Sequence, residues 1–305
     1  MAGKRAAATM NPPEAAEPQI VYVDDSGTDG KSKVAAAAFC VSTADRWEEL
    51  LKKWNKIAEH AVFELRNFHT TEFAACRRDH LCQQCQAGRT TVQDHPWQRW
   101  SEDKRENVLN RMAKALVKYV EWGVGHSYTK SDFDDHVRNS PARTALKEPV
   151  AAEYVTFAIQ RCGGSFAEWR AANSRDDRLK FVFDNSSARE KQDIAKVFFA
   201  AAHDRGQHED GIEQWFNPED VSYQSRKIAH ELLSPDMVAW TIASVRALHI
   251  FGRRGSRFVE AYWLAKVFVS TDHFKIGYLS KDTLAQWEKD KLRDAQRSNS
   301  DPCDN

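Results

Sequence analysis

The chain has 305 residues, and its 44 Lys and Arg residues balance its 44 Asp and Glu residues, so the formal net charge is +0 with His neutral. This balance excludes a uniformly basic nucleic-acid-binding protein. A nucleic-acid partner would have to be held by a local basic patch or through metal ions. Apolar residues make up 42% of the chain, but no segment approaches the roughly 20 apolar residues of a membrane span.

The two ends of the chain differ in composition from the part between them. Residues 1–18 are rich in Ala, Pro and Glu without a hydrophobic period, which predicts a disordered tail, and the polar residues 293–305 predict a flexible C-terminal tail. No apolar stretch follows Lys4 and Arg5, as a secretory signal requires, so we expect a cytoplasmic protein without a membrane partner. Residues 19–292 contain no long linker and predict a single domain, and nothing in them indicates an oligomeric state.

The first predicted elements are a β-hairpin and a helix. Residues 20–23 are β-rich and end in a cluster of turn-forming residues that begins at Asp24, and a second apolar run follows at 34–41. Residues 44–60 carry Trp, Leu and Ile at helical spacing, which predicts an amphipathic helix.

The middle of the chain alternates between irregular and periodic segments. Residues 76–100 are rich in Cys, Gln and Arg and predict an irregular insertion. Apolar residues at helical spacing predict helices over 102–121 and 148–162, with a strand at 123–129 between them.

The remaining elements complete a mixed α/β pattern. The run 179–183 predicts a strand that ends at Asp184, followed by a helix at 188–204 and a short strand near Val221. A Ser-Pro pair, which is favoured at a helix start, opens a predicted buried helix over 234–251. Strands that alternate with helices predict an α/β fold.

Three acids occupy positions where α/β folds place functional groups. Asp24 ends the first strand, Asp184 ends a later strand, and Asp236 begins a buried helix. Carboxylates that converge repel one another, and a divalent cation that prefers hard oxygen ligands removes this repulsion. Two such ions about 3.5–4 Å apart can bind the attacking and leaving oxygens of a phosphodiester. The acids therefore indicate metal-dependent phosphodiester chemistry, which needs no cationic protein surface.

Each acid also has a purely structural interpretation. Asp24 and Asp25 can shape the hairpin turn, and Asp184 can cap the helix that follows it. Asp236 lies in a first helical turn, where the helix dipole favours a negative charge by roughly 0.3–1 kcal/mol. The metal-site hypothesis depends on the three acids occurring together.

Four short motifs occur in order between about residues 20 and 250. Two of them contain a strand and its polar end: Val-Tyr-Val-Asp-Asp-Ser-Gly at 21–27 and Phe-Val-Phe-Asp-Asn-Ser-Ser at 181–187. The others are the Glu-Leu-Arg motif that begins at Glu64 and the Asp-Met-Val-Ala segment that begins at Asp236. This ordered set resembles the motifs of the prokaryotic family called domain of unknown function 3800. The chain departs from that family at Asp25, where the family has Glu, and at the Leu-Ser-Pro before Asp236, where the family has Gln-x-Ala.

The family is regarded as ribonuclease-H-like, so the resemblance implies a mixed sheet flanked by helices. It also implies helical insertions, because the helix at 44–60 comes earlier than in the simplest ribonuclease H order. A nuclease of this kind would cleave RNA or DNA with two Mg²⁺ or Mn²⁺ ions. The acids that the resemblance implies as metal-binding and catalytic are Asp24, Glu64, Asp184 and Asp236.

Further residues could assist such a site. His69 follows Glu64 closely and could transfer a proton, although a single His is often structural, and Asp25 is a reserve ligand. An acid-free basic stretch after the last predicted helix could hold a phosphate backbone or be a solvated helix end, and it contains Arg253, Arg254 and Arg257.

A group of thiols and one imidazole has part of the spacing of a zinc site. Its members lack a second pair at the standard distance, so we expect thiols of a surface loop and not a zinc ion at Cys76, His80, Cys82 and Cys85.

The leading hypothesis is a metal-dependent nuclease, and two alternatives stay open. One is a catalytically silent module that binds nucleic acid or protein on the same fold, which the altered residues before Asp236 favour. The other is a phosphohydrolase with Asp24 as nucleophile, but Ser26 stands where that pattern has its general acid.

Overall fold

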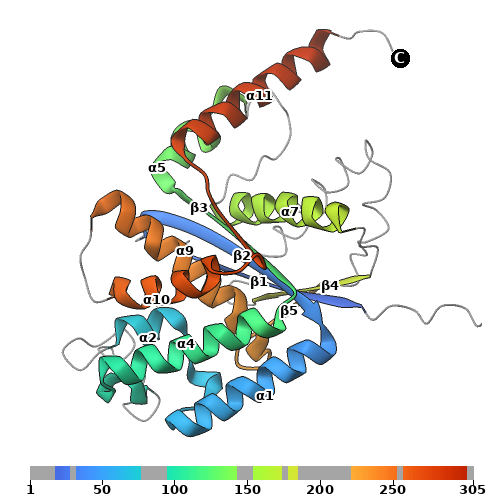
Figure 1. The fold of residues 1–305 in the computed structure, drawn as a ribbon. Helices are drawn as coiled ribbons and strands as arrows, with labels where there is room; N and C mark the ends of the chain where they lie inside the picture. The colour runs from blue at the N-terminus through green and yellow to red at the C-terminus, as the bar shows by residue number, and fades with distance from the viewer. Residues whose placement is uncertain are drawn as a thin grey trace, which may run out of the picture.

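The computed structural model describes residues 18–27, 32–76, 95–142, 154–173, 178–184, 221–252 and 257–300. Its centre is a six-stranded mixed sheet with the strand order β5-β4-β1-β2-β3-β6 (Figure 1). The strands are β1 (Gln19–Ser26), β2 (Val34–Thr43), β3 (Trp122–Thr129), β4 (Leu179–Asp184), β5 (Val221–Gln224) and β6 (Phe274–Tyr278).

The first three strands pair in antiparallel succession, and the outer strands are parallel to their neighbours. β1 pairs with β2 and β2 with β3 in antiparallel register, which confirms the predicted hairpin. β4 is parallel to β1, β5 to β4, and β6 to β3. Gly27 ends β1 with φ +72°, and a Cβ there would lie 2.1 Å from the carbonyl oxygen of Val34, so the turn requires glycine.

One face of the sheet is covered by a thick layer of helices. Figure 1 shows them below and to the left of the strands. Their buried side chains form one apolar cluster with Tyr22, Ala38 and Val182 of the sheet. The layer consists of α1 (Ala44–Ala61), α2 (Thr70–Ala75), α4 (Glu102–Tyr119), α9 (Leu233–Phe251) and α10 (Arg257–Val269).

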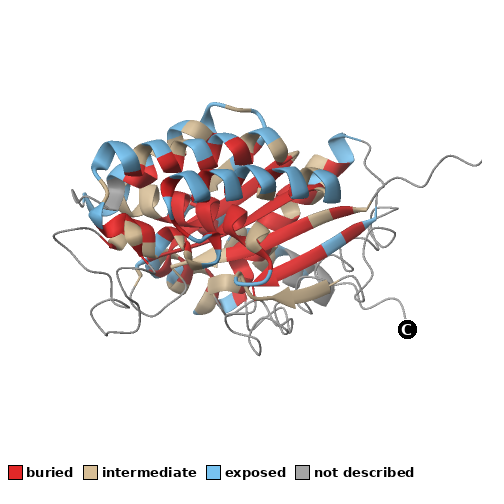
Figure 2. Ribbon diagram, turned by 90° about the horizontal axis from the view of Figure 1, so that it is seen from below, coloured by how far each residue is buried: buried red, intermediate tan, exposed pale blue. Residues whose placement is uncertain are grey.

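The opposite face carries a second, smaller apolar cluster. It joins Val21, Val23 and Phe39 of the sheet to α5 (Lys130–Phe133), α7 (Tyr154–Ala172) and α11 (Lys281–Ser300). Figure 2 shows buried residues concentrated in the strands and on the helix faces that pack on them. The remaining short helical segments are η1 (Leu65–Asn67), η2 (Pro96–Arg99), η3 (Asp134–Arg138) and η6 (His230–Leu232).

Local periodicity accounts for the elements that frame the site. Trp47, Leu50 and Trp54 recur at helical spacing in α1, and all three are buried. In α9 every residue from Leu233 to Ala243 is buried, as its nearly uniform apolar composition predicts. α9 therefore packs deeply against β1, β2 and β3.

The structure extends some predictions and corrects others. The strands and the helices at 44–60, 102–121 and 234–251 are confirmed within a few residues. α7 is longer than the predicted helix 148–162 and runs to Ala172. α11 continues to Ser300, so the part of the expected loose end up to that residue is helical. The predictions for 1–17, 77–94, 188–204 and 301–305 lie outside the described residues.

The sequence did not predict the elements after α9. α10, β6 and α11 follow in this region, and α11 has charged residues over most of its surface. In the described part of the chain, no helix combines the length and the apolar character that crossing a membrane requires.

Candidate functional site

Strand alternation places two of the predicted acids on the same face of the sheet. Tyr22 and Val182 face the cluster that contains α9, and side chains two residues further along a strand point the same way. These are Asp24 on β1 and Asp184 on β4. The parallel register pairs Val23 with Phe183, so the two acids are the next residues on strands about 4.8 Å apart.

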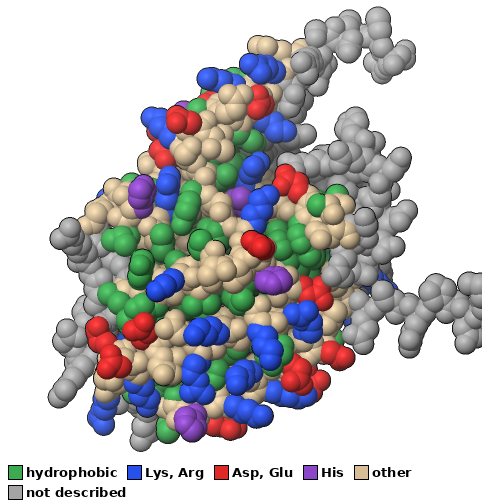
Figure 3. Space-filling model, in the orientation of Figure 1, with side chains coloured by type: hydrophobic (Ala, Val, Ile, Leu, Met, Phe, Trp, Pro, Cys, Tyr) green, Lys and Arg blue, Asp and Glu red, His purple; other side chains and the backbone are tan. Residues whose placement is uncertain are grey.

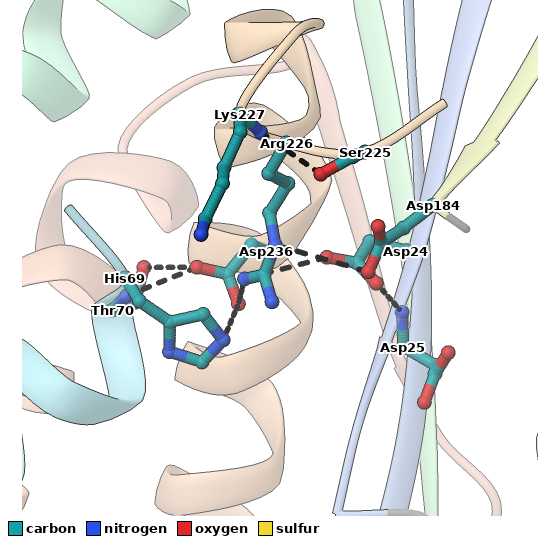
Figure 4. A network of polar contacts seen from close by, with 9 residues as sticks. All are labelled: Asp24, Asp25, His69, Thr70, Asp184, Ser225, Arg226, Lys227 and Asp236. Atoms are coloured by element: carbon teal, nitrogen blue, oxygen red, sulfur yellow. Dashed lines mark hydrogen bonds and ion pairs between the residues drawn. The ribbon is translucent and has the colours of Figure 1, made fainter. Parts of the chain in front are cut away.

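The third acid comes from the helix that packs on this face. Asp236 lies in the first turn of α9, and its carboxylate is buried like those of Asp24 and Asp184. Thr70, the first residue of α2, holds it in place: its backbone N–H donates to Asp236 Oδ2 at 3.0 Å and its hydroxyl donates to the same oxygen at 2.7 Å. Asp236 Oδ1 is thereby turned towards the other two acids (Figure 4).

A single guanidinium lies between the three carboxylates. Arg226 Nη1 is 3.3 Å from Asp236 Oδ1 and 4.0 Å from Asp24 Oδ2, and Arg226 Nε is 3.8 Å from Asp184 Oδ2 (Figure 4). Because the oxygens of Asp24 and Asp236 lie within 4.0 Å of the same nitrogen, they are less than twice that distance apart. The fold thus brings all three predicted acids together around one cation.

Two further side chains of the segment around α2 border this cluster. His69 Nε2 lies 3.8 Å from Asp236 Oδ1. Glu72 is partly exposed, and its Oε2 lies 3.2 Å from Nε2 of the buried His95. Burial raises the pKa of Glu72, but the hydrogen bond from His95 and the charges of His69 and Arg226 outweigh it, so this pKa is lowered.

The electrostatic environment keeps Asp236 ionised. Burial raises the pKa of its carboxyl, whereas His69, Arg226 and the hydrogen bonds from Thr70 lower it, and the net direction is downward. Burial lowers the pKa of Arg226, but the charges of Asp236, Asp24, Asp184 and Glu72 raise it, and the net direction is upward. The cluster is therefore a set of mutually stabilised charges.

Two predicted residues have other surroundings. Glu64 is 57% exposed and accepts hydrogen bonds from Arg66 and Asn67, and within the described structure no hydrogen bond or ion pair joins it to the three aspartates. Asp25 donates its backbone N–H to Asp24 Oδ1, but strand alternation places its side chain on the opposite face of the sheet, as Figure 4 shows. Neither side chain belongs to the cluster.

Several predicted residues lie where the structure gives no side-chain position. His80, Cys82 and Cys85 belong to 77–94, and Arg253 and Arg254 belong to 253–256, all outside the described residues. Only the backbone of Arg257 is described, as the first residue of α10. Cys76 is buried, and its sulfur accepts a hydrogen bond from Gln98 Nε2 at 3.3 Å, so this thiol is not on a surface loop as expected.

The sequence did not single out Arg226, Glu72 or Thr70. A signal existed for Arg226. It follows the end of β5 by two residues, and β5 is parallel to β4, so Arg226 lies at the same edge of the sheet as Asp184, the last residue of β4. Glu72 and Thr70 gave no comparable signal, because their segment meets Asp236 only after folding across 166 residues of chain.

The donor set of the cluster is made of hard oxygens. Three carboxylates from two strands and a helix are the ligand type that Mg²⁺ and Mn²⁺ prefer. Among the described residues, however, no three His, Cys, Asp or Glu side chains form a group that could hold a metal ion. The donor atoms are therefore of the type that such ions bind, whereas their present arrangement surrounds the guanidinium of Arg226.

Comparisons with known proteins add no relative. No family model, no curated protein and no solved structure matches the chain. The resemblance to the domain of unknown function 3800 therefore stays a prediction.

Proposed function

We propose that this protein is a metal-dependent nuclease that hydrolyses phosphodiester bonds of RNA or DNA on a ribonuclease-H-like fold. The observation that carries the proposal is the convergence of three buried aspartates, from β1, β4 and α9, on one cationic group. Burying three like charges together is costly unless a cation compensates them, and buried ion pairs contribute little net stability, so a functional role accounts better for the cluster.

The architecture supports this proposal. The resemblance implies acids on the first strand, on a later strand and on a C-terminal helix of a mixed sheet, and the acids occupy these three places. α1 and α4 are inserted between β2 and β3, as an elaborated version of such a fold requires. The altered residues before Asp236 leave its carboxylate directed into the cluster.

Asp24, Asp184 and Asp236 would hold the metal ions, which supply Lewis acidity and lower the pKa of bound water. The chain itself performs the supporting roles. Thr70 orients Asp236 through two hydrogen bonds, and His69 can accept or release a proton at Nε2, the atom that faces Asp236.

The helical layer that covers the face of the sheet with the three aspartates has a basic surface that suits a phosphate backbone. Figure 3 shows Lys and Arg side chains gathered over α1 and α4. Three exposed basic residues of α4 are Arg111, Lys114 and Lys118, which are three and four residues apart and so lie on one face of the helix. No acid occurs between residues 107 and 120, so this face is positively charged. Such a local stripe can bind nucleic acid although the net charge of the chain is +0.

The test is a cleavage assay on the full chain. We expect single- or double-stranded RNA or DNA to be cleaved with Mg²⁺ or Mn²⁺ and not with EDTA, and we expect Asp24→Asn and Asp184→Asn to lose this cleavage. Asp272→Asn, in an exposed turn, is the matched control and should retain it. Cleavage that persists in EDTA or in both site variants would contradict the proposal, and a trapped phosphoryl group on Asp24 would indicate the phosphohydrolase instead.

A second candidate is a catalytically silent binding module, and the position of Arg226 favours it. An arginine that permanently neutralises the acids would leave no place for a metal ion. Under this alternative the chain binds nucleic acid or protein, but neither Mg²⁺ nor Mn²⁺ binds, and Asp184→Asn leaves partner binding unchanged.

A further inference from the structure

We propose that the Arg226 guanidinium and a divalent cation compete for the carboxylates of Asp24, Asp184 and Asp236, so that Arg226 sets how tightly the site binds its metal ion. This inference rests on the proposed metal site and adds its regulation. It starts from the position of Arg226, whose three ion-pair partners lie on β1, β4 and α9 (Figure 4).

The guanidinium is held by charge and not by directed hydrogen bonds. A bidentate arginine–carboxylate pair has N···O distances of about 2.7–2.9 Å. The Arg226 distances are 3.3, 3.8 and 4.0 Å, and among the described residues its buried Nη1 has no hydrogen-bond partner. Arg226 thus satisfies the Coulombic demand of the cluster without the geometry that locks a structural arginine in place.

Charge counting shows why a metal ion can replace it. The single positive charge of the Arg226 guanidinium is shared among three carboxylates, and the charge of a further acid, Glu72, also acts on it. A divalent cation brings twice the charge of arginine to one point and accepts oxygen ligands from several directions. The cluster therefore favours the cation once it is available in solution.

The backbone allows the side chain to leave. Arg226 lies in a turn between β5 and η6, and its side chain is 22% exposed. Hydrogen bonds from the backbone N–H groups of Ile228 and Ala229 to the carbonyl oxygen of Ser225, at 2.8 and 2.9 Å, close the turn. The Arg226 side chain takes no part in these bonds, so it can turn to solvent without breaking them.

The experiment measures Mn²⁺ binding by calorimetry and unfolding by urea, both on the full chain. Arg226→Gln should bind Mn²⁺ at least about tenfold more tightly than the wild type, because the competing charge is removed. In EDTA this variant should be less stable than the wild type, and Mn²⁺ should restore more stability to it than to the wild type. Arg99→Gln, which removes an exposed arginine of η2, should leave Mn²⁺ affinity unchanged.

A second measurement uses the wild type and so does not depend on the folding of a variant. Phenylglyoxal modifies accessible arginines, and mass spectrometry reports the rate at Arg226. We expect saturating Mn²⁺ to raise this rate several-fold, since the side chain is released to solvent. An unchanged rate at Arg226 with Mn²⁺ bound would overturn the competition.

The outcomes separate this inference from the nuclease proposal. If the wild type cleaves nucleic acid but Arg226→Gln binds Mn²⁺ no more tightly, the competition is wrong and the nuclease stands. If Mn²⁺ binds only to Arg226→Gln, the competition stands and the wild type is the silent module. If neither protein binds Mn²⁺, both proposals fail.

Discussion

Two arginines of this protein, the buried Arg105 and the partly exposed Arg226, differ in how their charge is satisfied. Arg105 donates to the carbonyl oxygens of Phe73, Cys76 and Trp97, and its Nε and Nη2 donate to Glu260 Oε1 at 3.3 and 3.0 Å. Arg226 faces three carboxylates at longer distances, and the described structure gives it no hydrogen bond. Both cations face acids, but among the described residues only Arg105, which is fully buried, donates hydrogen bonds to the backbone.

The difference indicates what each centre does. Arg105 joins α2, η2, α4 and α10 by bonds that no other residue type could make together, and its guanidinium also lies 4.3 Å from the ring of Phe73. Arg226 is held by the charges of three carboxylates at 3.3–4.0 Å, so the proposed competition with a cation applies to Arg226 and not to Arg105.

The largest effect that tests this comparison is on stability. Arg105→Met should lower the free energy of unfolding by about 3–5 kcal/mol, because it leaves the buried charge of Glu260 and three carbonyl groups without their donor. Urea denaturation measures the loss. Mn²⁺ should add equal stability to this variant and to the wild type, in contrast to Arg226→Gln.

A double variant checks the cause. Arg105→Met with Glu260→Met removes both charges, so the pair should cost less than the sum of the single variants by about 0.5–3 kcal/mol. The unfolding free energy of the double variant should still lie below that of the wild type, because the carbonyl groups of Phe73, Cys76 and Trp97 lose the Arg105 donor. Additive losses would show that the Arg105–Glu260 pair is not the source of the stability.

An intermediate effect is expected at the hydrogen bonds that orient Asp236. Thr70→Val keeps the side-chain shape and the backbone N–H but removes the hydroxyl donor, which should cost about 1.5–3 kcal/mol at neutral pH. Thr70→Ser keeps a hydroxyl and should cost less. Equal losses in both variants, measured by urea denaturation, would mean that packing and not the hydrogen bond holds Asp236.

The same centre predicts a direction of pH dependence. The folded state lowers the pKa of Asp236 below its ordinary value of 3.8, so its ionised form stabilises the fold above that pH, and the contribution is lost as the pH falls through the lowered pKa. The difference in unfolding free energy between the wild type and Asp236→Asn should therefore narrow in this acid range. In Thr70→Val the loss should be complete at a higher pH, since one cause of the lowered folded-state pKa is gone while the unfolded-state pKa, which sets where the loss begins, is unchanged. A difference that stays constant down to pH 2.5 would exclude this linkage.

The smallest effect concerns two glutamates of neighbouring segments. Glu72→Gln should weaken Mn²⁺ binding by about tenfold, which is the loss of affinity typical when a residue that supports metal ligands is substituted. The reason is that the change removes an acid whose charge acts at the position of Arg226. Glu64→Gln should change neither Mn²⁺ affinity nor stability, because Glu64 is exposed and bonded to Arg66 and Asn67. Calorimetry on both variants decides which glutamate belongs to the site, and a loss at Glu64 alone would reverse the assignment.

Much of the fold followed from local pattern, and some of it did not. Short apolar runs joined by turn-forming residues were sufficient for β1 and β2, and helical spacing or a nearly uniform apolar composition was sufficient for α1 and α9. α11 was missed because its apolar residues are few, and those that join the apolar cluster are Leu284 and Trp287. A helix with mostly polar residues carries little of the periodic signal on which such predictions depend.

For the site, short-range pattern was enough to select Asp24, Asp184 and Asp236, because a strand that ends in an acid and an apolar helix that begins with one are visible in a few residues of sequence. Packing of distant segments was needed to bring Arg226 between them and Glu72 close enough for its charge to act on Arg226, whereas strand alternation alone places Asp25 on the other face. The physical reason is that an acid's position along a strand or helix is a local property. The charge that compensates it depends on which turn the folded chain places beside it, and no spacing in the sequence encodes that distance.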